Sequence, residues 1–185
     1  MYSQPRENDL VLIEKEFLNF SADKLIQLMG RIETCVGMLT AEQVWTRASD
    51  KQNAVGNLLL HLNGNVRQWI LHGIGGQPNH RDRDAEFAAA ATQGEGREAQ
   101  ELLTPLRATV EEAVALFHTL PPGRLLERTS NQGYEGTVLA AIYHVVEHFA
   151  GHTFQIILLT KQFTNEDLRF YAHLSGSQPR KDALP

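Results

Sequence analysis

Residues 137–162 read TVLAAIYHVVEHFAGHTFQIILLTKQ and carry the clearest helical pattern of the chain. Their apolar side chains recur at steps of three and four residues, a spacing that forms one face of an α-helix but not one face of a strand. The members of this apolar stripe are Val138, Leu139, Ile142, Val145, Val146, Phe149, Ile156 and Ile157. The stretch therefore predicts a long helix that buries one face against neighbouring helices.

Three further segments of the chain repeat this helical period. The helices expected from them lie at about residues 9–36, 54–72 and 98–118. A break near Ser21 can interrupt the first, and Asn53 is a suitable N-cap for the second. Between the helices, polar residues, glycine and proline predict connections at residues 40–53, 73–96 and 124–136. No segment alternates apolar and polar residues strongly, so we do not expect a substantial sheet.

The connection at residues 73–96 is long for a helical bundle, in which roughly two to eight residues usually join antiparallel neighbours. It can therefore cross the bundle and let the second and third helices run parallel. Together these features predict an all-α four-helix bundle in one domain, residues 1–185, with its core at about 9–162. The tail at 163–185 contains apolar residues that can dock on the bundle, namely Leu168, Phe170 and Tyr171.

The composition narrows the classes of partner and compartment. The chain has 185 residues and a net charge of −5, with scattered lysines and arginines, which does not favour a nucleic-acid partner. Its single cysteine, Cys35, excludes an intrachain disulfide and a cysteine-rich zinc site, and it favours a reducing compartment. Because neither a secretory leader nor an apolar run of about 18 residues is visible, we expect a cytoplasmic protein with no membrane partner.

Three histidines are the candidate metal ligands. His148 and His152 lie four residues apart, so on a helix their Cβ atoms are roughly 5 to 6 Å apart on one face. His61 falls at the edge of the apolar stripe of the second helix and can supply a third nitrogen to the same divalent ion. Such a site keeps one position open for water or substrate. Spacing alone leaves a surface pair or a hydrogen-bonded structural pair as alternatives.

Other polar and aromatic residues have more ordinary interpretations. His144 is expected to support the ligands from behind or to lie at the surface, with a ligand role in place of His61 as the alternative. Gln155 is a candidate to orient the ligand rings. Cys35 is expected to be a small buried apolar residue rather than a nucleophile. The histidines expected to face solvent are His72, His80, His118 and His173. The aromatic residues expected to serve packing rather than ligand binding are Trp45, Trp69, Tyr134 and Tyr143.

Two segments resemble the DinB-like family of damage-inducible helical proteins. They are N57-L-L-L-H-L-N-G-N65, followed by Trp69, and H144-V-V-E-H-F-A-G-H-T-F-Q155. The resemblance implies a bundle that runs up, down, down, up, and a homodimer. It also implies one divalent metal ion bound by His61, His148 and His152. Where family members often carry His-Arg-Gly-Gln after the last ligand, this chain carries H152-T-F-Q155.

The resemblance implies a function as well. Characterised DinB-like proteins include thiol-dependent S-transferases and isomerases that use low-molecular-weight thiols such as bacillithiol or mycothiol. By this similarity, the chain binds a thiol at the open position of a zinc or nickel ion and transfers it to a small-molecule substrate. A hydrolase that activates metal-bound water would use the same residues. The alternatives are a non-catalytic metal-stabilised stress-response or interaction protein and a metal-free bundle. Further catalytic and cofactor-binding residues are unassigned.

Overall fold

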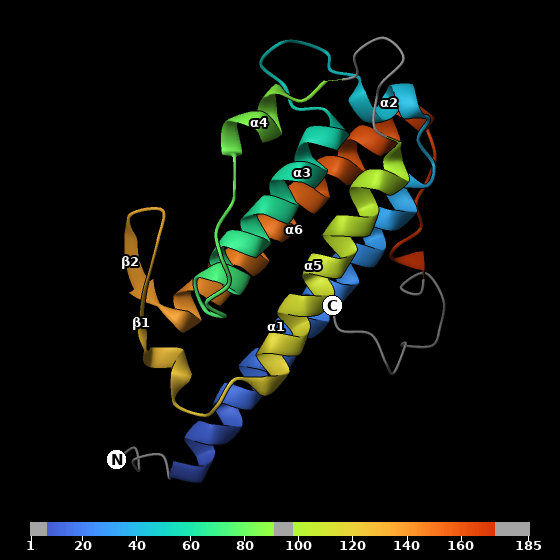
Figure 1. Cartoon of the computed structure of the whole chain (residues 1–185). Coiled ribbons are helices and arrows are strands. Elements are labelled where there is room, and N and C mark those ends of the chain that lie inside the picture. The colour runs from blue at the N-terminus through green and yellow to red at the C-terminus, as the bar shows by residue number, and fades with distance from the viewer. Residues whose placement is uncertain (1–6, 91–97, 173–185) are drawn as a thin grey trace.

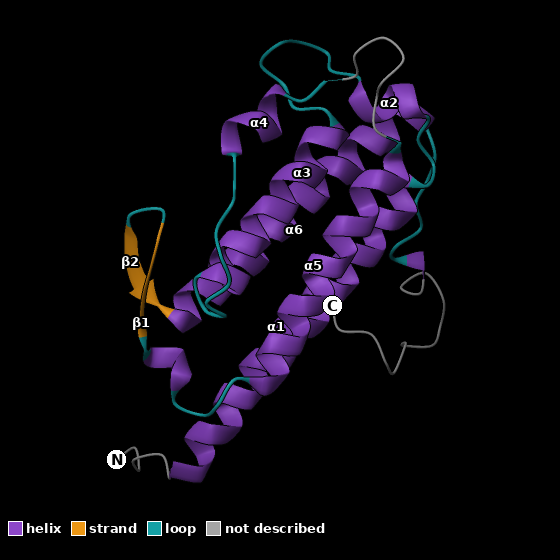
Figure 2. Ribbon diagram, in the orientation of Figure 1, coloured by secondary structure: helices purple, strands orange, loops and turns teal. Residues whose placement is uncertain are grey.

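A computed structural model describes residues 7–90 and 98–172 of the chain. These residues are mostly helical and include one small two-stranded sheet (Figures 1 and 2). In chain order the elements are α1 (Glu7–Val36), α2 (Ala41–Trp45), α3 (Val55–Val66), the π-helix η1 (Arg67–His72), α4 (Arg83–Ala88), α5 (Ala99–Thr119), the 3-10 helix η2 (Arg124–Leu126), β1 (Arg128–Asn131), β2 (Tyr134–Thr137) and α6 (Val138–Thr164).

The long helices pack side by side around one apolar core (Figure 1). Helix α1 contacts α5 and α6, and α3 also contacts α5 and α6. The four helices predicted from the sequence are therefore present, with ends that differ by a few residues. Ser21 does not break α1, which is continuous from Glu7 to Val36, and its hydroxyl donates to the main-chain oxygen of Phe17 at 2.7 Å. No described helix has the length and apolar character needed to cross a membrane.

The start of the second predicted helix differs from the expectation. Helix α3 begins at Val55 after Ala54, so Asn53 is not its N-cap. The cap comes instead from inside the first turn, where Asn57 Oδ1 accepts a hydrogen bond from the main-chain N–H of Ala54 at 3.0 Å. The Asn57 amide nitrogen also donates to the main-chain oxygens of Glu86 at 3.0 Å and Ala89 at 2.7 Å. One buried amide thus caps α3 and ties α4 to it.

The predicted connections contain short elements of their own. In the first, Thr40 and Gln43 form a capping box that starts α2. In the last, β1 and β2 form a hairpin whose two-residue turn has Gln132 at φ 53° and Gly133 at φ 80°. Two successive positive φ angles define the turn type whose twist suits a tight hairpin. Each strand is only four residues long, too short to give a visible alternation in the sequence.

The second predicted helix also changes its geometry along its length. After Val66 the chain continues as the π-helix η1, and the main-chain N–H of Gly73 bonds to the oxygen of Gln68, five residues earlier. Such wide turns are rare and occur often at functional sites. Beyond α6, Leu168 and Phe170 pack against the core as expected, whereas Tyr171, the third residue of the tail prediction, is exposed. The end of the tail, residues 173–185, lies outside the described residues.

Candidate metal centre

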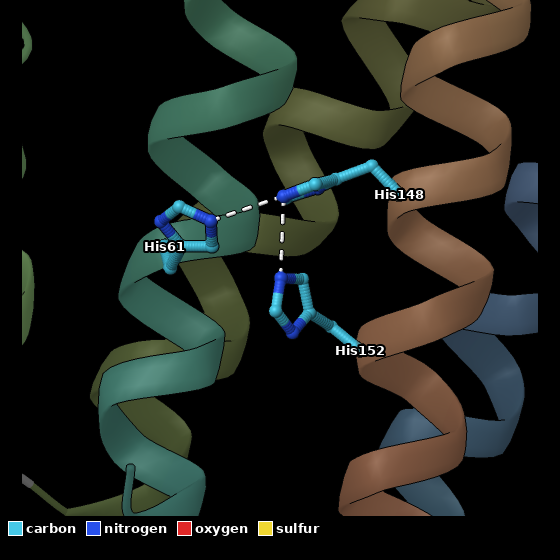
Figure 3. A group of neighbouring side chains, drawn as sticks. All are labelled: His61, His148 and His152. Carbon is cyan, nitrogen blue, oxygen red and sulfur yellow. Dashed lines mark hydrogen bonds between the residues drawn. The ribbon is translucent and has the colours of Figure 1, made fainter. Parts of the chain in front are cut away.

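Three imidazole rings from two helices meet at one point (Figure 3). His61 projects from α3, and His148 and His152 project from successive turns of α6. Nε2 of His148 lies 3.1 Å from Nε2 of His61 and 3.2 Å from Nε2 of His152. Among the described residues, these three form a group of side chains whose ligand atoms all lie within 4.8 Å of one another. The predicted convergence of the three histidines is therefore present.

In His61 and His152, a neighbouring acceptor determines which ring nitrogen carries the hydrogen. Nδ1 of His61 is 2.9 Å from Oε2 of Glu86, and Nδ1 of His152 is 2.9 Å from Oε1 of Gln155. Both oxygens only accept hydrogen bonds, so each Nδ1 carries the hydrogen. Arg81 Nη2 is also 3.1 Å from Nδ1 of His61, but it donates to Glu86 Oε2 at 2.9 Å. The Nε2 lone pairs of His61 and His152 consequently face the centre of the cluster.

Hydrogen bonds alone cannot satisfy this cluster. The Nε2 atom of His148 has either one hydrogen or one lone pair in the ring plane, so it can bond to only one of its two neighbours. A cation at the centre would be coordinated by all three lone pairs. With zinc–nitrogen bonds of roughly 2.0 to 2.1 Å, tetrahedral geometry places two ligand nitrogens about 3.3 Å apart. The spacings at His148 are close to that value.

A buried ion pair supports the ring of His61 from behind. Arg81 Nε donates to Glu86 Oε1 at 2.7 Å, and Arg81 Nη1 donates to Gln68 Oε1 at 2.9 Å. The side chains of both ion-pair partners are less than a tenth exposed. A carboxylate that accepts from the outer nitrogen of a ligand histidine fixes the orientation of the ring and makes its other nitrogen a stronger ligand.

The ion pair fits against α3 because the helix has no side chain at that point. A Cβ built on Gly64 would lie 1.9 Å from Glu86 Oε1 and 2.8 Å from Arg81 Nε. Any larger residue would therefore displace the pair that holds His61. The sequence motif around His61 thus includes a glycine whose role is to admit the carboxylate.

The protonation states suit a cation site. Burial and the positive charges of neighbouring groups lower the pKa of His148 to about 3. Burial lowers the pKa of His152 as well, although the hydrogen bond to Gln155 opposes this shift. At Glu86, burial raises the pKa of the carboxyl, but Arg81 and His61 outweigh burial and leave that pKa below its ordinary value. At neutral pH, His148 and His152 are therefore uncharged and Glu86 is ionised.

A cavity of about 410 Å³ adjoins the cluster. The residues that line it include His61 and His148 of the cluster, together with Trp69, His144 and residues of the β1–β2 hairpin. Its volume falls within the range of small-molecule pockets, roughly 300 to 1,000 Å³. Trp69, expected from the sequence only to pack, also lines this cavity. Tyr134 lines it too, but Tyr134 and Tyr143 are both exposed, so the expectation that they serve packing is wrong.

The other residues singled out in the sequence lie around this centre or away from it. His144 is not in the ligand group; its ring centroid lies 4.4 Å from that of Trp69 and 5.6 Å from that of His148. Gln155 orients a ring, as expected, and that ring is His152. Cys35 is fully buried, and burial raises the pKa of its thiol. The exposed histidines include His72, His80 and His118, whereas His173 lies outside the described residues.

Two functional residues were missed from the sequence. Arg81 and Glu86 lie in the 73–96 segment, which was read as a plain connection. The available signal was Asp82, an N-cap residue whose side chain accepts from the main-chain N–H of Ala85 and starts α4. That signal predicts a helix, but it does not predict which side chain faces His61.

Comparison with known families gives one match. The family described as "Protein of unknown function (DUF1572)" matches residues 13–176, which include all three histidines and the ion pair behind His61. The chain belongs to the DUF1572 family. Among curated proteins, no match to this DUF1572 member was found.

Proposed function

We propose that this protein binds one divalent metal ion through His61, His148 and His152 and uses it to activate a small nucleophile. The supporting observation is that Glu86 and Gln155 keep the hydrogens of His61 and His152 on Nδ1. The Nε2 lone pairs of both rings are therefore directed at the ring of His148. Zinc and nickel are the metals we favour, because both accept imidazole nitrogens. The DinB-like resemblance supports the same ligand set and, together with the long segment between η1 and α5, an up-down-down-up order of the helices.

The nucleophile that we favour is a low-molecular-weight thiol, which makes the protein a metal-dependent S-transferase. When bound, the ion would lower the pKa of a coordinated thiol or water and so supply a nucleophile at neutral pH. Cys35 cannot provide a protein thiol for this purpose, because it is buried and does not line the cavity. A hydrolase that uses water in place of the thiol would need the same residues.

In this proposed activity, residues of the chain have three roles. The three rings hold the ion, the Arg81–Glu86 pair keeps His61 oriented, and the cavity beside His148 holds the substrate away from bulk water. The small-molecule substrate would enter between the β1–β2 hairpin and η1, which both line the cavity. From the resemblance we also expect a homodimer, which sedimentation analysis would test.

A cobalt-loaded sample tests the proposed activity directly. Titration with a small thiol should produce a thiolate-to-cobalt absorption band, and His148→Ala should lose both the metal and the band. The matched control is His118→Ala, which removes an exposed histidine outside the cluster. A cobalt spectrum that no thiol changes would contradict the thiol-transferase proposal.

A non-catalytic structural ion is the second candidate. It is favoured by the position of the cluster, which ties α3 to α6. A structural ion should resist chelators and raise the melting temperature strongly without exchanging a ligand for thiols. Exchange of a ligand for a thiol, together with easy removal by a chelator, would favour the catalytic role.

A further inference from the structure

Three polar atoms of residues that line the cavity have no hydrogen-bond partner among the described residues, and one of them is Nδ1 of the proposed ligand His148. Oδ1 of Asn65 and Nε1 of Trp69 are both buried and have no hydrogen-bond partner in the described part of the chain. Asn65 as a whole is only 4% exposed. Both residues line the cavity that adjoins His61 and His148.

An unsatisfied buried donor or acceptor is costly, so such atoms usually have a partner from outside the protein, either water or a ligand. Asn65 is in the last turn of α3 and Trp69 is in η1, four positions later on the same continuous helix. Side chains four apart lie on one helical face. Both residues line the same cavity, so its wall includes an unpartnered acceptor and an unpartnered donor among the described residues.

The indole that carries the donor is held in place. The ring of Trp69 packs on the ring of His144 with centroids 4.4 Å apart. This contact supports the ring from one side, while its Nε1–H remains without a protein partner among the described residues. A fixed donor beside a buried acceptor is a recognition element rather than an adaptable surface.

We infer that this wall binds a ligand group that carries an N–H and a C=O on the same edge, such as a primary carboxamide or a cyclic amide. The N–H of the ligand donates to Asn65 Oδ1, and its carbonyl oxygen accepts from Trp69 Nε1. A carboxylate does not suit this position, because it has no hydrogen for Asn65 Oδ1. The inference rests on the proposed function, in which the other end of the same molecule coordinates the metal.

Two arginines, Arg81 and Arg83, also line the cavity. The guanidinium of Arg81 is engaged by Glu86 and Gln68. The guanidinium of Arg83 lies over the ring of Phe87, 4.9 Å from its centroid. Oδ1 of Asn65 and Nε1 of Trp69 carry no formal charge, so this part of the wall suits a neutral ligand group.

Two matched thiols test the inference on the unmodified cobalt-loaded protein. The probes are 3-mercaptopropanamide and methyl 3-mercaptopropanoate, which share the thiol and the carbonyl but differ in the N–H. Dissociation constants come from the thiolate absorption band. We expect the amide to bind at least about tenfold more tightly, which corresponds to about 1.4 kcal/mol.

Variants assign the two hydrogen bonds separately. Asn65→Leu should weaken the amide about tenfold and leave the ester unchanged, because the ester has no N–H to donate. Trp69→Phe should weaken both probes, because both have the carbonyl. Trp45→Phe is the control, since it removes an indole N–H from a tryptophan that does not line the cavity.

The binding results distinguish failure of the amide-binding inference from failure of the proposed metal-dependent function. Equal binding of amide and ester by the unmodified protein would overturn the inference and leave the metal site standing. A cobalt spectrum that neither probe changes would overturn the proposed function and the inference with it. The comparison in the unmodified protein does not depend on whether any variant folds.

Discussion

Nε2 of His148 lies 3.1 Å from Nε2 of His61, although 87 residues separate the two side chains along the chain. The packing of α3 against α6 brings them together, and Glu86 and Gln155 fix the hydrogens of His61 and His152 on the outer nitrogens. This arrangement favours a cation more than it favours hydrogen bonds among the rings.

Glu86→Gln should weaken metal binding by about 10- to 100-fold. The amide is similar in size, but it is neutral, so it loses the ion pair with Arg81 and accepts more weakly from His61. Competition with a chelator of known affinity measures the effect. Glu135→Gln is the control, because it removes the charge of an exposed carboxylate that lines the cavity. Equal metal affinity in Glu86→Gln and the unmodified protein would contradict this role of Glu86.

Gly64→Ala should weaken metal binding and destabilise the fold by about 1 to 3 kcal/mol. The added Cβ would meet Glu86 Oε1 at 1.9 Å, so the ion pair must move away from His61. Gly30→Ala provides the matched control, since nothing lies within 4 Å of its added Cβ in α1. The control should gain up to about 1 kcal/mol from helix propensity. Denaturant unfolding and chelator competition measure both variants, and a neutral Gly64→Ala would refute the close approach.

Much of the fold was predictable because each long helix shows a repeated apolar period within its own stretch of sequence. The helical periods predicted four helices, and residues four apart in 137–162 predicted that His148 and His152 share a face. The two-residue turn at Gln132 and Gly133 was missed because its strands are too short to show alternation.

The surroundings of the metal ligands could not be predicted in the same way. Glu86 reaches His61 because α4 packs against a glycine on α3, and this contact between distant segments has no periodic signal. The lack of a partner among the described residues for Asn65 Oδ1 and Trp69 Nε1 depends on the shape of the cavity. The sequence therefore predicts the ligands better than it predicts what orients them or what lies beside them.

The metal-free protein should lose stability as the pH falls from 7 towards 4. The pKa of His148 is lowered to about 3 and that of His152 is also lowered, so below pH 6.5 the unfolded chain binds protons that these folded residues do not. Each such group lowers the free energy of unfolding by at most about 1.4 kcal/mol for each unit by which the pH falls. Glu86, whose pKa is lowered in the fold, adds a loss in the same direction below about pH 4.5.

Urea unfolding at several pH values measures this dependence. The variant His148→Phe removes one of the two lowered groups and should flatten the profile between pH 6.5 and 5. A free energy of unfolding that stays constant from pH 7 to 5 in the unmodified protein would contradict the neutral, buried state of these rings.

Removal of the metal should lower the melting temperature of the unmodified protein. An ion that binds only the folded state stabilises it by about 4 kcal/mol when its free concentration is 1,000 times the dissociation constant. The variant His152→Ala should melt at the same temperature with and without added metal. If a chelator leaves the melting temperature of the unmodified protein unchanged, the ion does not bridge α3 and α6.

The most direct measurement is the metal content of untagged protein purified without chelators or metal columns. The proposed site predicts one equivalent of a divalent ion per chain in the unmodified protein and in His118→Ala, and less than about a tenth of an equivalent in His61→Ala. Equal metal contents in His61→Ala and the unmodified protein, or no bound metal after incubation with zinc or nickel, would contradict the three-histidine centre.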